Sequence, residues 1–335
     1  MKRRRALGLL LALSLLMSAL PIPARANSPS QAETLLAAMS PAEKVGQLFL
    51  ITFNGSNISE GSPLWELVTA YHVGGFVLRA DHDNFSGTDT LSAAYDLIAA
   101  MQTAAWEKTQ PAPNTNLSGE LPAYVPLFIG IEQNGNSSNQ ILSGLSDQPN
   151  QMTLGATWSP SLAQQAGQVL GSELSALGFN LFLGPTLDVA ETASMETASY
   201  AGADIYGADP YWVGEIGQAY IAGLHSGSEN RLSVVARHFP GLGSADRPPD
   251  EEVATVRKSL EQLKQIELAP FFAVTSAEDP TARADGVMVS HIRFQGFQGN
   301  IRATTRPISF DATALAQLLA VEPLASWRAE GGLTV

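Results

Sequence analysis

The chain has 335 residues, with 19 basic against 32 acidic side chains and no cysteine. The missing cysteine excludes disulfides and thiolate metal sites. The acidic balance disfavours nucleic acid as a partner, because a negative surface repels a phosphate backbone. The five histidines show no metal-ligand spacing, so we expect neither a metal ion nor a cofactor.

Residues 1–26 have the pattern of a secretory signal peptide. A basic stretch from Lys2 to Arg5 precedes an apolar stretch from Ala6 to Leu20, which is short for a membrane span. Ala24-Arg25-Ala26 offers a small-x-small cleavage site. We expect cleavage after Ala26, a mature domain of residues 27–335 and a secreted or periplasmic location. The alternative is a retained anchor; after signal removal we expect no membrane span.

Helical and strand patterns alternate along the rest of the chain. Helix starts are indicated at Ser30, Ser40, Ser62, Ser159 and Asp209, and further helices are predicted over residues 90–108, 259–276 and 311–320. Short apolar runs predict strands at residues 48–53, 74–78, 126–131, 179–187, from 233, and 286–291, with a seventh beginning at 331–335. Residues 110–122 are typical of a surface loop.

Regular alternation of strands and helices indicates parallel pairing in an α/β fold. The predicted architecture is a TIM-type (β/α)8 barrel, and an open doubly wound sheet is the alternative. No Gly-x-Gly-x-x-Gly pattern follows an early strand, which weakens the nucleotide-binding version of that alternative. Since the seventh strand has barely begun at Val335, we expect the barrel to be incomplete at the C-terminus, with its last strands missing.

Four of the predicted strands end in polar side chains. The strand ends carry Glu132, Asp188, the pair Arg237-His238, and His291 after Ser290. The carboxyl ends of parallel strands meet at one edge of a sheet, which is where barrel enzymes build their sites. We therefore expect these side chains to gather in one place.

Six motifs occur in an order that resembles the N-terminal barrel of glycoside hydrolase family 3, especially its β-N-acetylhexosaminidase branch. The resemblance covers most of residues 40–335. Its most specific parts are Arg237-His-Phe-Pro-Gly241 and Met288-Val-Ser-His291; the weaker ones are Ala42-Glu-Lys-Val-Gly-Gln-Leu48, Val73-Gly-Gly-Phe76, Gly207-Ala-Asp-Pro210 and Glu267-Leu-Ala-Pro-Phe271.

This resemblance implies a retaining glycosidase. An aspartate nucleophile forms a glycosyl-enzyme intermediate, and a second group protonates the leaving oxygen and then activates water. In the hexosaminidase branch that second group is a loop histidine held by an aspartate. By the same resemblance Arg237 and His238 grip sugar hydroxyls, Glu132 stands at the family's sugar-binding aspartate, and Asp188 and His291 complete the substrate-binding set.

The chain also departs from the family pattern. The nucleophile is expected just after the strand that begins at 331–335, so it is not in the chain and residues 27–335 alone are predicted to be inactive. The acid/base loop reads Asp250-Glu-Glu252, which makes Glu252 a candidate acid/base, with a solvated acidic loop as the alternative. Asn136 falls within an altered binding segment, and Gln140 and Asp204 stand where the family has binding arginines.

The sequence therefore predicts an exported glycoside hydrolase of the β-N-acetylhexosaminidase or β-glucosidase kind, acting on a carbohydrate substrate. A catalytically degenerate sugar-binding relative in the cell envelope is the alternative. The sugar, the linkage and the oligomeric state are not predicted.

Overall fold

The computed structural model describes residues 30–110, 124–135, 142–191, 202–249 and 252–335. The chain divides into two compact units, residues 1–39 and 40–335. In the first unit, α2 (Gln31–Ala38) begins at a capping box in which Ser30 and Glu33 bond each other's backbone N–H groups, as the sequence predicts. All other described helices and strands belong to the second unit.

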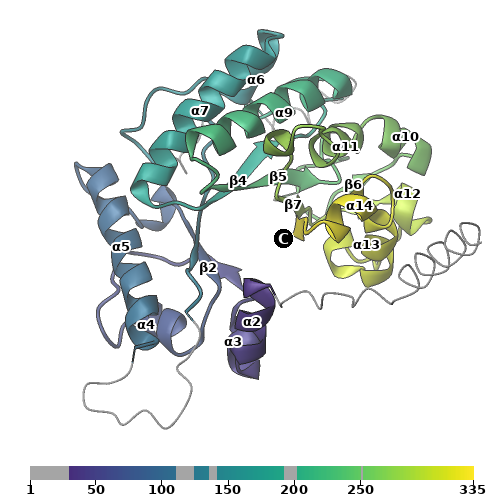
Figure 1. Cartoon of the computed structure of the whole chain (residues 1–335). Coiled ribbons are helices and arrows are strands. Elements are labelled where there is room, and N and C mark those ends of the chain that lie inside the picture. The colour runs from purple at the N-terminus through teal and green to yellow at the C-terminus, as the bar shows by residue number, and fades with distance from the viewer. Residues whose placement is uncertain (1–29, 111–123, 136–141, 192–201, 250–251) are drawn as a thin grey trace, which may run out of the picture. The chain divides into compact units, whose positions relative to one another are not determined.

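A seven-stranded parallel sheet forms the centre of the second unit (Figure 1). Its strands lie side by side in chain order: β1 (Leu50–Ile51), β2 (Gly75–Leu78), β3 (Phe128–Ile131), β4 (Leu181–Thr186), β5 (Ser233–Phe239), β7 (Gly286–Val289) and β9 (Leu333–Thr334). The predicted α/β class, the parallel pairing and the seven strand positions are confirmed. A doubly wound sheet would reverse its strand order at a switch point, and this sheet does not.

The sheet is curled (Figure 1). Apolar side chains cover both of its faces. Side chains alternate across each strand. On β4, Phe182 faces the large core beneath the helices, while Leu181 and Leu183 face the inner side of the curl. There they meet Val77 of β2 and Val235 of β5. Burial on both faces explains why the strands read as continuous apolar runs. β1 and β9 form the two edges, and no pairing joins them in the described sheet.

Helices cover the outer face between successive strands. The described helices of this unit are α3 (Pro41–Gly46), α4 (Pro63–Thr69), α5 (Thr90–Lys108), α6 (Gln151–Ala156), α7 (Pro160–Leu177), α9 (Pro210–Gly227), α10 (Leu260–Gln265), α11 (Ala269–Thr275), α12 (Gln295–Gln298), α13 (Ala312–Leu319) and α14 (Leu324–Ala329), with 3-10 turns η1 (Ala80–His82), η2 (Pro280–Ala282) and η3 (Ile308–Phe310). Most starts match the sequence prediction because each has a capping side chain or a proline in its first turn.

The single helix predicted over residues 259–276 is wrong, because two helices, α10 and α11, occupy that stretch. Pro270 has no N–H to bond the carbonyl of Ile266, and its ring would clash with that carbonyl in a continuous helix. The break turns Glu267 into the interior.

A second, two-stranded parallel sheet pairs β6 (Thr255–Val256) with β8 (Arg293–Phe294). The sequence does not predict it. A bridge between Ala245 and Val256 ties it to the turn that follows β5. It thus braces the segments that leave the carboxyl ends of β5 and β7.

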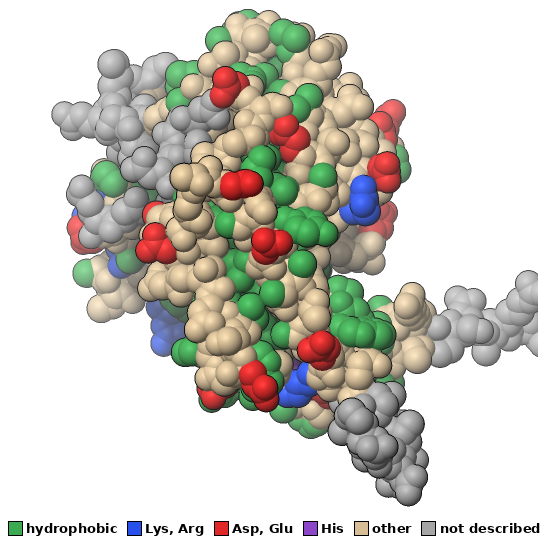
Figure 2. All heavy atoms as spheres, turned by 90° about the vertical axis from the view of Figure 1, so that its left-hand side faces the viewer, with side chains coloured by type: hydrophobic (Ala, Val, Ile, Leu, Met, Phe, Trp, Pro, Cys, Tyr) green, Lys and Arg blue, Asp and Glu red, His purple; other side chains and the backbone are tan. Residues whose placement is uncertain are grey.

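On the face that Figure 2 shows, acidic side chains are more frequent than basic ones, and hydrophobic side chains lie scattered between them. This matches the negative charge of the chain. In the described part of the chain, no helix combines the length and the apolar character needed to cross a membrane.

Candidate functional site

The residues predicted to share one edge of the sheet do so. Glu132 directly follows β3, and Asp188 follows β4 by two residues. Arg237 and His238 are among the last three residues of β5, and His291 follows β7 by two residues. The register pairs Thr186 with Arg237 and Phe239 with Val289, so these ends are level with one another. We call this carboxyl edge of the sheet, from β2 to β7, the rim.

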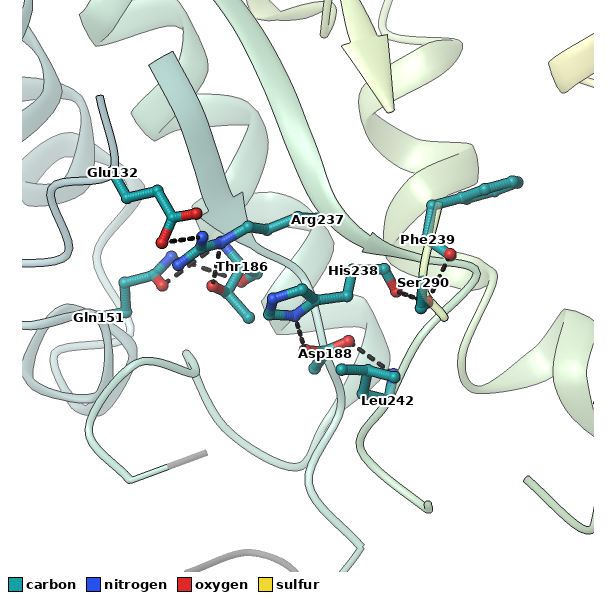
Figure 3. Close-up of polar contacts among 9 residues, drawn as sticks. All are labelled: Glu132, Gln151, Thr186, Asp188, Arg237, His238, Phe239, Leu242 and Ser290. Carbon is teal, nitrogen blue, oxygen red and sulfur yellow. Dashed lines mark hydrogen bonds and ion pairs between the residues drawn. The ribbon is translucent and has the colours of Figure 1, made fainter. Parts of the chain in front are cut away.

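An ion pair joins two of the predicted residues across the rim (Figure 3). Nη1 of Arg237 lies 2.7 Å from Oε2 of Glu132, and its Nε donates to Oγ1 of Thr186 at 3.4 Å. The Arg237 side chain is only 7% exposed, whereas that of Glu132 is 23% exposed. By alternation along β5, Arg237 points to the same inner side as Val235. A polar layer therefore sits directly above the apolar inner cluster.

Thr186 and Gln151 support this layer, and sequence reasoning missed both. Gln151 is buried at the start of α6, and its amide bonds the N–H and the C=O of Thr186 at 3.4 Å each. Thr186 could have been found by its position at the end of a buried strand. Gln151 gives no signal in the sequence, because only the fold brings α6 beneath β4.

A second contact joins Asp188 and His238. Nδ1 of His238 lies 2.8 Å from Oδ2 of Asp188, and the backbone N–H of Leu242 donates to Oδ1 at 2.7 Å. A carboxylate only accepts, so the proton of the imidazole is on Nδ1 and Nε2 is left as an acceptor. Asp188 is buried, while the His238 side chain is 32% exposed. Asp188 thus orients an imidazole whose other nitrogen is available at the rim.

The turn after β5 is shaped to carry these contacts. Gly241 has a φ of +124°, which favours glycine. A Cβ on Gly243 would lie 1.7 Å from the carbonyl oxygen of Val189, so the turn can pack against the segment after β4 only with glycine there. Next to it, Ser244 Oγ and Lys258 Nζ each bond Oε1 of the buried Glu267 at 2.5 Å. This network anchors the turn that delivers the Leu242 N–H to Asp188.

β7 contributes Ser290 and His291 in different ways. The buried Ser290 donates to the carbonyl of Phe239 at 2.6 Å and so ties β7 to β5 at the rim. His291 is exposed, with Nδ1 2.8 Å from Oγ of Ser309 and its ring edge-to-face with Phe310. His291 therefore lies at the predicted edge but contacts η3 rather than the other rim residues.

Arg79 is a rim residue that the sequence analysis overlooked, although it follows β2 just as Glu132 follows β3. It forms a two-bond ion pair with Asp81, at 2.9 and 2.8 Å. This hydrogen bonding raises the pKa of Arg79, and the charge of Glu132 raises it further. The negative charge of Glu132 therefore acts on two arginines, one on each side.

The candidate acid/base does not contact the rim in the described residues. The Glu252 side chain is 67% exposed and forms an ion pair with Nη1 of Arg247. Asp250, Asn136 and Gln140 lie outside the described residues. The backbone of Asp204 is described, next to the loop that leads to α9. In the described part of the chain no group of three or more possible ligand side chains could hold a metal ion.

The fold and rim define a curled parallel α/β domain with a hydrogen-bonding site at its carboxyl edge, the general design of barrel enzymes. Residues 41–322 match the glycosyl hydrolase family 3 N terminal domain, and the chain belongs to that family. The family resemblance noted in the sequence is thereby confirmed.

Named relatives agree with this assignment. A β-hexosaminidase of Nitrosomonas eutropha is 25% identical over 240 residues, which is 69% of this chain and 64% of that protein. A β-hexosaminidase of Thiobacillus denitrificans is 30% identical over 175 residues, 50% of this chain and 47% of that protein. A β-N-acetylglucosaminidase/β-glucosidase of Cellulomonas fimi is 28% identical over 80% of this chain and 40% of its own. The chain thus spans less than two thirds of these relatives.

A solved structure gives the same answer for the fold. The glycoside hydrolase family 3 β-N-acetylglucosaminidase from Paenibacillus sp. str. FPU-7 superimposes with a TM-score of 0.67 at 25% identity. The match covers 89% of this chain and 55% of that one.

Proposed function

We propose that this protein is a glycoside hydrolase that acts on O-glycosyl bonds by a retaining mechanism, on substrates of the β-N-acetylhexosaminide or β-glucoside kind. One observation carries the proposal: in a family 3 chain, three adjacent strands bring two bonded pairs, Glu132–Arg237 and Asp188–His238, to the same edge of the sheet. Sugar hydroxyls both donate and accept, so they suit a rim that offers both functions.

Each rim residue has a distinct part in this proposal. Nε2 of His238 accepts a hydrogen bond from a sugar hydroxyl, because Nδ1 is occupied by Asp188. Glu132 uses Oε1 for a second hydroxyl, because Oε2 is paired with Arg237. Arg237 is buried and acts mainly by holding Glu132. His291, which is exposed at the same edge, would contact a more distant part of the substrate.

We also propose that the sheet is part of a (β/α)8 barrel in which one further strand joins β9 to β1. Two features support this. Both edge strands have unpaired sides, and an apolar cavity of about 160 Å3 lies between them, lined by Leu48, Leu50, Leu181, Val235 and Leu333. The nucleophilic carboxylate of the family would follow the strand that β9 begins.

Glu252 remains our candidate for the acid/base. Two observations favour the alternative function, a sugar-binding protein without catalysis. Glu252 is exposed and paired with Arg247, and Asp204 stands where the family has a cation. If no group replaces the family's histidine, the protein would bind sugar without efficient turnover, because a general acid–base contributes roughly 10²–10⁴-fold to the rate.

We propose, from residues 1–26, that the protein is exported and cleaved after Ala26. Mass spectrometry of the N-terminus of protein recovered from the medium or periplasm tests this. A mature chain that still begins at Met1 would contradict it.

The activity is tested with aryl β-N-acetylglucosaminide and aryl β-glucoside, on the full-length gene product. Hydrolysis with retention, lowered at least a hundredfold by Glu252→Gln but not by Glu261→Gln on α10, supports the enzyme and its acid/base. Hydrolysis unaffected by Glu252→Gln removes Glu252 from the mechanism. A folded protein that binds the sugars without hydrolysis supports the sugar-binding alternative.

A further inference from the structure

A second hollow lies beside the rim, between α6 and the start of α9. Its cavity of about 220 Å3 is lined mainly by apolar side chains, with Asp209 as its carboxylate; the lining includes Met152, Trp158, Tyr206, Trp212 and Val213. Pockets for drug-sized ligands measure roughly 300–1,000 Å3, so this cavity suits a single ring. Its lining residue Gly207 pairs with Val189, the neighbour of Asp188. The hollow therefore lies next to the segment that follows Asp188.

Aromatic side chains form part of the wall of the hollow; Tyr206 among them is buried, whereas Trp158 is exposed. Trp158 is 57% exposed, and Tyr211, beside the hollow, is 64% exposed. Both rings pack edge-to-face on Trp212, with centroid distances of 5.1 Å for Trp158 and 5.6 Å for Tyr211. Contacts of this geometry hold aromatic rings in place. The two indoles of Trp158 and Trp212, at 86° to each other, form a fixed corner that faces solvent.

The backbone of Trp158 is unusual for its residue type. Its φ is +51°, in the left-handed region, where a bulky side chain is an outlier. It comes two residues after the end of α6, just past the C-cap Thr157, whereas after α7 the left-handed residue is Gly178, with φ +96°, at the C-cap itself. Glycine or asparagine is the ordinary residue there. A strained tryptophan kept at an exposed helix end points to a use for its side chain.

We propose that Trp158, Trp212 and Asp209 form a second saccharide site, which binds one pyranose ring of a neutral glycan chain. The C–H face of the ring would lie on an indole face, which is apolar and electron-rich. A hydroxyl would donate to Oδ2 of Asp209, because Oδ1 already accepts the N–H groups of Tyr211 and Trp212 at 2.9 and 3.2 Å. The choice of a glycan as ligand rests on the proposed function.

The site would hold a sugar outside the rim. Since the hollow adjoins the segment after Asp188, a glycan chain bound there would be kept close to the place where its end is gripped. This would raise the local concentration of the chain at the rim.

The test is the binding of chitotetraose by isothermal titration calorimetry and by indole N–H signals in 1H–15N spectra. Asparagine tolerates left-handed backbone, so Trp158→Asn removes the ring without adding backbone strain. We expect binding at least tenfold weaker in Trp158→Asn, an unchanged urea midpoint, and shifts of the Trp158 and Trp212 signals in the unmodified protein. The control is Trp106→Asn on α5, since Trp106 is also exposed and packs edge-to-face on Tyr124.

The outcomes separate this site from the rim. If Trp158→Asn binds chitotetraose as tightly as the unmodified protein, the second site is refuted, whatever the rim does. If Trp158→Asn loses binding and His238→Ala keeps it, the second site stands and the rim assignment fails. If Trp158→Asn also lowers the urea midpoint, Asp209→Asn, which keeps the cap of α9 and leaves the indole corner in place, must weaken binding for the site to stand. If Trp158→Asn instead abolishes a concentration-dependent dimer seen by sedimentation and leaves binding intact, the surface is an interface between copies and the saccharide site is refuted.

Discussion

The contact between Asp188 and His238 gives the sharpest prediction from the rim. Asp188 is buried and accepts two hydrogen bonds, from His238 at 2.8 Å and from the Leu242 N–H at 2.7 Å. Hydrogen bonds to a charged group contribute about 1.5–3 kcal/mol each, so Asp188→Ala should lower the free energy of unfolding by about 3–6 kcal/mol. In Asp188→Asn the amide oxygen can keep the Leu242 bond, and the loss should be about 1–3 kcal/mol.

Asp188→Asn should also move a proton on His238. An amide NH2 facing Nδ1 makes that nitrogen an acceptor, so the neutral imidazole should carry its proton on Nε2 instead. Urea unfolding measures the stability, and the 15N shifts of the imidazole report the tautomer. Asp209→Asn is a matched control, since Asp209 also accepts two backbone N–H groups but is exposed, and asparagine caps a helix equally well. Equal stabilities of Asp188→Ala and Asp188→Asn, or an unchanged tautomer in Asp188→Asn, would refute this account of the contact.

Three other predictions concern the ion pair, a buried histidine and the helix packing. Arg237→Met should lower the free energy of unfolding by about 1–3 kcal/mol, less than for a fully buried pair because Glu132 is partly exposed. Adding Glu132→Gln to this variant should recover part of that loss in urea unfolding. If the effects of the two substitutions simply add, the pairing is contradicted. His225 has Nδ1 2.7 Å from the Thr281 carbonyl and Nε2 2.9 Å from Asp285 Oδ2, two acceptors. Burial lowers the pKa of His225, but the hydrogen bond and charge of Asp285 and the bond to Thr281 outweigh it, so the pKa is raised. A raised pKa stabilises the fold below about pH 6.5 and loses that contribution as pH rises through the folded value, so unfolding free energy should fall above about pH 6.5. His225→Gln should abolish that fall, and an unchanged pH profile in this variant would sink the assignment. Gly223→Ala should lower the free energy of unfolding by about 1–3 kcal/mol, because its Cβ would lie 2.1 Å from the Gln164 carbonyl oxygen. The control is Gly214→Ala on the same helix, whose Cβ would lie 3.0 Å from the Ala273 methyl, so the free energy of unfolding should change by less than about 1 kcal/mol. Equal effects of the two substitutions in thermal unfolding would argue against close α7–α9 contact.

The strands and helix starts could be predicted because their signals are local. A strand such as 181–186 is buried on both faces and therefore apolar throughout, and a start such as Asp209-Pro210 carries its own cap. The position of the polar residues followed in turn, since parallel strands place their carboxyl ends together. What held for Glu132 and Asp188 also held for Arg79, which the same rule would have found.

The missed parts of the fold depend on contacts distant in sequence. β6 and β8 have two residues each, too few to show a period, and they exist because the turns after β5 and β7 meet. The division of the predicted helix 259–276 had a local signal in Pro270.

The partners within the rim were equally beyond the sequence. Nothing in the order of residues says that Glu132 pairs with Arg237 rather than facing solvent, or that Gln151 reaches Thr186. These contacts follow from the curl of the sheet, which turns alternate side chains of β3, β4 and β5 toward a common interior.

The chemistry of the rim follows from how its carboxylates are used. Glu132 is paired with Arg237, and Asp188 accepts hydrogen bonds from His238 and from the Leu242 N–H, so both carboxylates already act as acceptors within the rim. A general acid has to donate a proton to the leaving oxygen instead. In the described residues the rim is therefore built to bind and orient hydroxyls. Under our proposal the proton must come from another group, and Glu252 can serve only if it leaves Arg247 and reaches the rim.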